Sequence, residues 1–241
     1  MIGEYMKVDE DQLKAVEKKK SRAKSFNDSV VLSSFLKAIH EMIEIGSKMT
    51  KTEMARFTYS VSRWMLHRTK KKSKRKCPSG TIIEVDFGLP YKGEVPYRHS
   101  ALVIKEYPTK VLVVPSTSNK IFWNNAYHPI ENPSGEKDYY RVTKDDGFDH
   151  DCVLVLTEYK VISKNRIIST FGEINNELGE SAYKNIREIL INDIFHEEIN
   201  AYNNKISQLE NKILEDEQII SEKKKRIGIL YSKINRIKSS K

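Results

Sequence analysis

The chain of 241 residues is long enough for one large or two small domains, yet only 39% of its residues are hydrophobic and 31% are charged. This balance is poor in apolar residues for a globular chain, and it predicts one compact core with long, solvated helical extensions. No apolar run reaches the roughly 18 residues that a membrane span needs, and the charged start lacks the apolar stretch of a signal peptide. We therefore expect a soluble, cytoplasmic protein with no membrane partner.

The net charge of +9 is concentrated at the beginning of the chain. Residues 1–79 hold 19 Lys and Arg against 9 Asp and Glu, whereas the remaining residues hold 23 against 24. A positive excess confined to one segment indicates a polyanionic partner, most simply nucleic acid.

Three helices are expected in residues 1–68, which we assign as a helical extension. Residues 9–24 have an acidic start and a basic end, which suits the helix dipole, but their apolar content predicts a marginal helix or a disordered arm. Residues 30–45 follow the N-cap sequence Asn27-Asp28-Ser29 and carry apolar residues largely on one face, and Gly46 suits a C-cap. A third helix begins near Thr50 and is expected to pack against the second as a hairpin.

Residues 69–79 form a basic linker to the next domain. Six of its side chains are cationic, namely Lys70, Lys71, Lys72, Lys74, Arg75 and Lys76. Such a run is either a solvated linker that keeps the protein soluble or a phosphate-binding strip that gives salt-dependent, sequence-independent affinity for RNA. Its expected position at the mouth of the following sheet favours the strip.

Three β-branched apolar runs predict a sheet in residues 80–119. The runs are residues 81–87, 101–104 and 111–114, separated by connections rich in Gly, Pro and Lys. Polar side chains stand where runs begin or end: Arg98 and His99 before the second, and Ser116, Thr117 and Ser118 after the third. Loops held by a rigid sheet are where chemistry is usually carried, so these residues are the candidate site.

The following region, residues 119–151, is polar and contains aromatic residues, among them Trp123, Tyr127, Tyr139 and Tyr140. These rings either stack on unpaired RNA bases or cap the sheet as core residues. Residues 151–164 predict a late strand, residues 166–174 a short strand or turn, and residues 177–194 a helix.

The tail, residues 195–241, carries a heptad repeat with Ile at every a position: Ile199, Ile206, Ile213, Ile220, Ile227 and Ile234. Apolar residues fill four d positions, Tyr202, Leu209, Leu230 and Ile237. Asp216 and Lys223 interrupt the d positions, and Gly228 weakens the helix. Ile at a with Leu at d favours a parallel dimer, so we expect a homodimer through the coiled coil, the sheet domain or both. Packing of the stripe on the chain's own N-terminal helices is the open alternative.

The stretch from about residue 77 to 194 resembles the PemK/MazF family of toxin endoribonucleases. The shared features, in order, are Gly80, Val85-Asp86-Phe87, Gly93-Glu94, Arg98-His99, Pro115-Ser116-Thr117-Ser118 and the late strand of residues 151–164. The resemblance implies an α+β fold with a small SH3-like antiparallel β-barrel at residues 80–194, flanked by the N-terminal helices and a long C-terminal coiled-coil helix. It does not cover either extension.

The resemblance also implies a function, that of a toxin of a type II toxin–antitoxin system. Such a toxin cleaves single-stranded RNA at selected sequences without a metal ion and is held inactive by an antitoxin protein. In the family, an Arg before the second strand and a Thr or Ser after the third form the catalytic pair. Since the usual Arg-Pro is replaced by Arg98-His99-Ser100, either Arg98 is the family Arg with one residue inserted or His99 takes its position.

RNA cleavage without a metal requires deprotonation of the 2′-OH, stabilisation of charge on the phosphate and protonation of the leaving 5′-oxygen. We assign proton exchange to His99, phosphate binding to Arg98, and a hydrogen bond to the phosphate to Thr117. Further substrate contacts are expected from Glu94, Ser116, Ser118, Glu158 and the six cationic linker residues. The sequence shows no His, Cys or acidic spacing typical of a metal site, so no metal or cofactor is expected.

A second hypothesis is a non-catalytic RNA-binding or scaffold protein that uses the same barrel, basic arm and coiled coil. A third, a related toxin fold that acts on a protein such as gyrase, is disfavoured by the basic strip and the polar strand ends. Growth arrest on expression that Arg98→Ala or Thr117→Ala abolishes would favour the nuclease.

Overall fold

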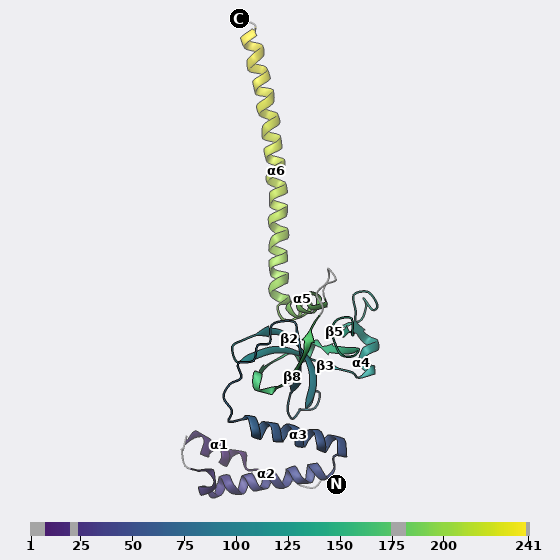
Figure 1. Ribbon diagram of the computed structural model, residues 1–241. Coiled ribbons are helices and arrows are strands. Elements are labelled where there is room, and N and C mark those ends of the chain that lie inside the picture. The colour runs from purple at the N-terminus through teal and green to yellow at the C-terminus, as the bar shows by residue number, and fades with distance from the viewer. Residues whose placement is uncertain (1–7, 20–23, 175–181, 240–241) are drawn as a thin grey trace, which may run out of the picture. The chain divides into compact units, whose positions relative to one another are not determined.

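The computed structural model describes residues 8–19, 24–174 and 182–239 (Figure 1). It is an α+β protein, as expected from the sequence. The chain divides into two compact units, Met1–Thr117 with Glu158–Gly172, and Ser118–Thr157 with Glu173–Lys241.

The first unit begins with the helices α1 (Glu10–Lys18), α2 (Ser29–Ser47) and α3 (Lys51–His67), with a short 3-10 turn η1 (Ser25–Asn27) before α2. The predicted N-cap of α2 is confirmed, since the carboxylate of Asp28 accepts hydrogen bonds from the amides of Val30 and Val31. A capping box between Thr50 and Glu53 begins α3.

The predicted C-cap at Gly46 is wrong, because α2 continues through this residue to Ser47. Gly46 lies inside the helix and against the third helix: a Cβ atom there would stand 2.6 Å from Cε of Met54. Its role is therefore close approach rather than helix termination. Elsewhere α2 keeps much apolar surface in solvent, and Leu36 and Ile43 are more than half exposed.

Five strands form the sheet of the first unit, β1 (Thr81–Asp86), β2 (Arg98–Glu106), β3 (Lys110–Thr117), β7 (Lys160–Ser163) and β8 (Ile167–Glu173). They are hydrogen-bonded in the order β7-β3-β2-β1-β8, with β1–β2, β2–β3 and β3–β7 antiparallel. The three apolar runs are thus confirmed as β1, β2 and β3. Pairing in the described residues follows an open path, because β8 does not return to β7.

The predicted late strand is divided. Residues 151–164 hold β6 (Cys152–Val155), a 3-10 turn η2 (Leu156–Glu158) and β7. The turn separates two strands with different partners, since β6 pairs with β5 and β7 pairs with β3. A further 3-10 turn, η3 (Lys164–Arg166), leads into β8. Strand β8 confirms the short strand that was one of two predictions for residues 166–174.

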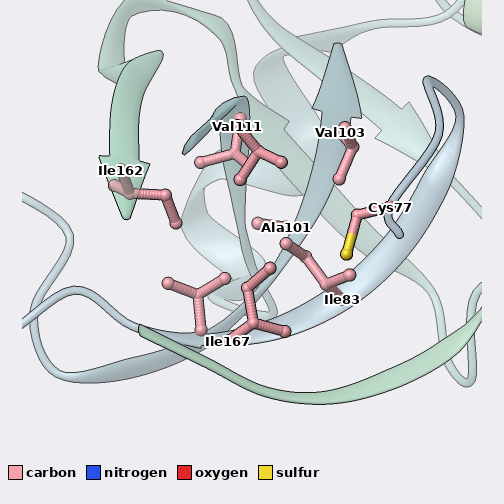
Figure 2. Packing of buried hydrophobic residues seen from close by; sticks show 9 residues of the cluster. Cys77, Ile83, Ala101, Val103, Val111, Ile162 and Ile167 are labelled. Atoms are coloured by element: carbon pink, nitrogen blue, oxygen red, sulfur yellow. The ribbon is translucent and has the colours of Figure 1, made fainter. Parts of the chain in front are cut away.

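Alternate residues of the strands build the core of the first unit. Figure 2 shows side chains from β1, β2, β3, β7 and β8 converging with Cys77 at the end of the linker. The buried set comprises Cys77, Ile83, Val85, Ala101, Val103, Val111, Val113, Ile162 and Ile167. Because successive side chains of a strand point to opposite faces, this set fixes which residues at the strand ends face the core.

The second unit contains α4 (Lys120–Asn125), β4 (Ala126–Tyr127), β5 (Glu136–Val142), β6, α5 (Ala182–Ile194) and α6 (His196–Ser239). Strand β5 pairs in parallel with β4 and antiparallel with β6. The sequence did not predict β5, because its first three residues are charged and exposed. The helix expected at residues 177–194 is observed as α5, and residues 175–181 lie outside the described residues.

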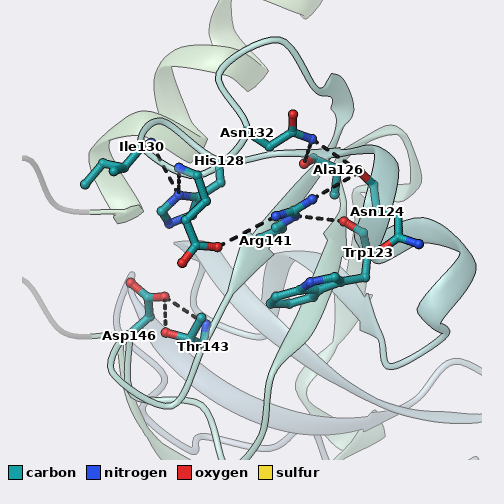
Figure 3. A network of polar contacts seen from close by, with 10 residues as sticks. Trp123, Asn124, Ala126, His128, Ile130, Asn132, Arg141, Thr143 and Asp146 are labelled. Carbon is teal, nitrogen blue, oxygen red and sulfur yellow. Dashed lines mark hydrogen bonds and ion pairs between the residues drawn. The ribbon is translucent and has the colours of Figure 1, made fainter.

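Arg141 on β5 organises the polar contacts of this unit (Figure 3). Its Nε donates to the carbonyl oxygen of Trp123 at 2.7 Å and its Nη2 to that of Asn124 at 3.1 Å. The neighbouring Tyr140 is buried, and burial raises the pKa of its phenol to about 12. Of the two predictions for the aromatic residues, stacking on RNA bases or packing in the core, the second is therefore confirmed for Tyr140.

The C-terminal α6 is a single helix of 44 residues (Figure 1). It confirms a long terminal helix over most of residues 195–241. None of the helices in the described ranges is both long enough and apolar enough to cross a membrane.

Candidate active site

The polar strand ends named from the sequence meet at one end of the first unit's sheet. Val85 pairs with His99 across β1 and β2, and Ala101 pairs with Pro115 across β2 and β3. Continuing the second register by two residues sets Thr117 opposite His99. Since Val85 faces the core, His99 and Thr117 lie at the edge of the core-facing side of the sheet.

His99 is held at this edge by the neighbouring strand. Its Nδ1 lies 2.9 Å from the carbonyl oxygen of Ser116, and because a carbonyl only accepts, the ring donates through Nδ1. Burial lowers the pKa of His99 below its ordinary value; the hydrogen bond to Ser116 opposes this shift and the positive charge of Arg56 adds to it. The ring is therefore neutral at pH 7, with Nε2 as an acceptor.

Arg98 occupies the other side of the sheet. It pairs with Asp86 in the β1–β2 register, and its Nε lies 3.1 Å from Oε1 of Glu84. Its guanidinium also lies over the ring of Tyr59 in α3, 5.6 Å from the ring centre. The structure thus brings His99 and Thr117 to one face and directs Arg98 to the opposite one.

The remaining strand-end residues have mixed surroundings. Ser116 is buried, and its hydroxyl donates to the carbonyl oxygen of Ser100 at 3.1 Å, a contact within the sheet. Glu158 is brought to the same end of the sheet, where its carboxylate accepts from the Val95 amide and lies 3.4 Å from the Lys160 ammonium. Ser118 begins the second unit.

The loop between β1 and β2 carries Glu94. This side chain is exposed, and its carboxylate accepts a hydrogen bond from the amide of Tyr91 at 3.1 Å. The contact closes a local turn in which Gly93 has a φ of 98°, a conformation that favours glycine. Glu94 therefore shapes the loop and leaves its second carboxylate oxygen toward solvent.

The basic linker is fixed at two points. The amide of Ser73 donates to Oδ1 of Asn165 at 2.8 Å, and the amide of Cys77 donates to Oε1 of Glu106 at 2.9 Å. Glu106 is the last residue of β2 and Arg98 the first, so the linker ends far from the predicted catalytic residues. All six cationic side chains, Lys70, Lys71, Lys72, Lys74, Arg75 and Lys76, are exposed.

Sequence reasoning missed the contact of α3 with the end of β1. The hydroxyl of Ser60 donates to Oδ1 of Asp86 at 2.6 Å in a buried hydrogen bond, and the same oxygen accepts from the Gly88 amide. Nη1 of Arg166 donates to the Asp86 carbonyl oxygen at 3.0 Å. No local pattern marks these residues, because their partners lie 26 and 80 positions apart.

A cavity of about 540 Å³ opens between these elements. Its lining includes the cations Arg63, Arg68 and Arg166 and the ring of Trp64, while Asp86 is the acidic residue in the lining. The guanidinium of Arg68 lies 5.3 Å from the centre of the Trp64 ring. Cations beside an exposed ring suit an anion that carries a planar group, as a nucleotide does.

His67 also lines the cavity, and its pKa is lowered there. Burial lowers its pKa, and the positive charges of Lys70 and Arg63 lower it further. The cationic residues Arg63, Arg68 and Lys70 thus lie near His67, where the basic linker leaves α3.

Within the described ranges, no three His, Cys, Asp or Glu side chains gather as candidate metal ligands. Comparison with models of protein families and with curated proteins finds no match to this chain.

Proposed function

We propose that this protein is a metal-independent endoribonuclease that cleaves single-stranded RNA at the edge of the sheet formed by His99 and Thr117. The observation that carries the proposal is the hydrogen bond from Nδ1 of His99 to the Ser116 carbonyl oxygen, because it holds His99 on the core-facing side, where the β2–β3 register continued by two residues sets it opposite Thr117. In this proposal His99, rather than Arg98, corresponds to the catalytic Arg of the PemK/MazF family, which the sequence resembles.

In this proposal, Nε2 of His99 takes the proton from the 2′-OH, and the 2′-oxygen attacks the adjacent phosphorus. The bond to the 5′-oxygen breaks, leaving a 2′,3′-cyclic phosphate and a 5′-hydroxyl that takes its proton from solvent. The Thr117 hydroxyl donates to a phosphate oxygen, and the charge of Arg56 favours the developing anion. Arg98 positions the end of β2 through Glu84 and Tyr59.

The wider assignment follows the resemblance. The sheet of residues 80–194, whose described strands pair along an open path, takes the place of the family's small SH3-like barrel. The protein is the toxin of a type II toxin–antitoxin system, restrained in the cytoplasm by an antitoxin protein. The exposed cations of the linker and the arginines of the cavity support RNA as the substrate, since they provide backbone affinity without sequence readout.

The experiment is cleavage of a long single-stranded RNA by the purified full chain in excess EDTA. Wild type is expected to give discrete fragments with 5′-hydroxyl ends, and RNA with 2′-O-methyl groups should stay intact because it lacks the nucleophile. The variant Thr117→Val keeps the shape of the side chain and should lose cleavage. Fragments from 2′-O-methyl RNA would contradict the proposed chemistry.

One observation favours a second function, a non-catalytic RNA-binding protein. The guanidinium of Arg98 contacts Glu84 and Tyr59 on the opposite face of the sheet, so the arginine of the Arg98-His99 pair does not face Thr117. Intact RNA together with salt-sensitive binding in the same assay would select this function. Growth arrest on expression that His99→Ala abolishes would exclude it.

A further inference from the structure

The helix α6 carries an apolar stripe that the rest of its own unit leaves in solvent. The described side chains of residues 200–236 are all exposed. At the a positions, Ile206, Ile213, Ile220, Ile227 and Ile234 are 47–57% exposed. A helix of 44 residues gains most of its stability from packing one face against a partner, so a stripe of this length indicates a partner helix.

The charges in the middle of the helix decide how a second copy would lie. Acidic residues cluster at 215–217, and basic residues follow at 223–226. Two of these charges, Asp216 and Lys223, stand at d positions inside the stripe itself. In a parallel, in-register dimer each would face its own copy, and both layers would bring like charges together in the seam.

We propose that α6 pairs with α6 of a second copy as an antiparallel coiled coil centred near Gln218. In this arrangement each a residue lies level with a d residue of the other helix. Ile206 then meets Leu230 of the second copy, Leu209 meets Ile227, and Tyr202 meets Ile234. The apolar pairs flank both sides of the centre, and the acidic residues 215–217 of one helix lie level with residues 219–221 of the other, next to its basic residues 223–226.

In the same register, the two charged d residues, Asp216 and Lys223, each lie near a residue of opposite charge on the other helix. Lys223 of the second copy lies three residues from the level of Asp216, about 4.5 Å along the axis at 1.5 Å per residue. A lysine side chain spans this separation, so each buried-seam charge has an opposite partner, twice per dimer. The Ile-and-Leu rule that favours parallel dimers has little weight here, because only two d positions hold Leu.

Distances between spin labels on the full chain test the direction of the helices. Asn204→Cys and Gln218→Cys place labels at f positions, which face away from the seam. The antiparallel register keeps the two 218 labels level and sets the two 204 labels about 42 Å apart along the axis. Wild type is the control, since Cys77 and Cys152 are buried. Equal short distances at both positions would show a parallel dimer, and the absence of any inter-label distance would show an unpaired helix; either overturns the proposal.

Charge reversal tests the same arrangement through affinity. Asp216→Lys should raise the dissociation constant of the dimer at least about tenfold, which is about 1.4 kcal/mol, because it sets two cations side by side. Adding Lys223→Asp should restore the wild-type constant. Glu215→Lys is the matched control, since it makes the same charge change at a c position, away from the seam. An unchanged dissociation constant for Asp216→Lys would contradict the antiparallel register.

Discussion

At the scale of single residues, the proposed chemistry depends on how β2 directs two neighbouring side chains. Arg98 and His99 are adjacent in sequence, yet a strand directs them to opposite faces. The residue types at the site were predictable from the sequence, because polar groups at strand ends stand out beside apolar runs. Which of the two faces Thr117 was not predictable, because that depends on a register set by Val85 and Ala101 in other strands.

Burial of His99 predicts a stability that depends on pH. Its pKa is lowered in the folded protein, so between that value and the ordinary 6.5 the unfolded chain binds more protons. The free energy of unfolding should therefore fall as the pH drops below about 6.5. Urea unfolding at pH 7.5 and 5.5 measures this loss, and His99→Asn should make it smaller.

His67 shifts in the same direction, so the variant His67→Asn should also reduce the loss of stability in acid. A loss that is the same in wild type and in the double variant His67→Asn/His99→Asn would show that neither histidine is responsible.

At the scale of elements, β1 to β3 follow from the sequence because β-branched runs between glycine-rich and proline-rich connections suit a buried strand. Two elements depart from their local pattern. Strand β5 forms although three charged residues begin it, because Tyr140 and Val142 are buried. Helix α2 passes through Gly46, where a glycine is required because Met54 occupies the space that a side chain would need.

The attachment of α3 to β1 is predicted to depend on one buried hydrogen bond. Ser60→Ala removes the donor at 2.6 Å from Asp86 and leaves a carboxylate oxygen with one partner fewer. The free energy of unfolding should fall by about 1–3 kcal/mol, the usual cost of a buried polar group that loses its partner. Urea unfolding measures the change.

Ser62→Ala is the control for this variant, because Ser62 lies on the same helix with its side chain exposed. It should shift the unfolding free energy by less than about 0.5 kcal/mol. Equal effects of the two substitutions would mean that the contact with Asp86 contributes nothing specific.

At the scale of the whole molecule, the uneven charge is expected to govern RNA affinity. The linker cations are exposed, and the amides of Ser73 and Cys77 hold the linker backbone in place. Exposed cations bind phosphates by releasing counterions, so the affinity for single-stranded RNA should fall as salt rises.

Removing three of these cations should therefore flatten the salt dependence. The triple variant Lys70→Ala/Lys71→Ala/Lys72→Ala is expected to reduce the slope of log affinity against log salt by about 2, at about 0.7 per phosphate contact. Fluorescence anisotropy with labelled RNA at several salt concentrations measures the slope. The control removes three exposed lysines in α1 and at its C-cap, Lys14, Lys18 and Lys19, and an equal change in that variant would refute a specific role for the linker.

We propose that His99, and not Arg98, performs the cleavage. The most direct test compares initial rates of RNA cleavage in excess EDTA for wild type, His99→Ala and Arg98→Ala, with RNA binding measured beside each rate. We predict that His99→Ala lowers the rate by about 10²-fold or more with binding retained, as loss of a general base does. Arg98→Ala should retain a rate within about tenfold of wild type, because it removes contacts on the far face of the sheet. A large loss in Arg98→Ala with His99→Ala still active would contradict this assignment.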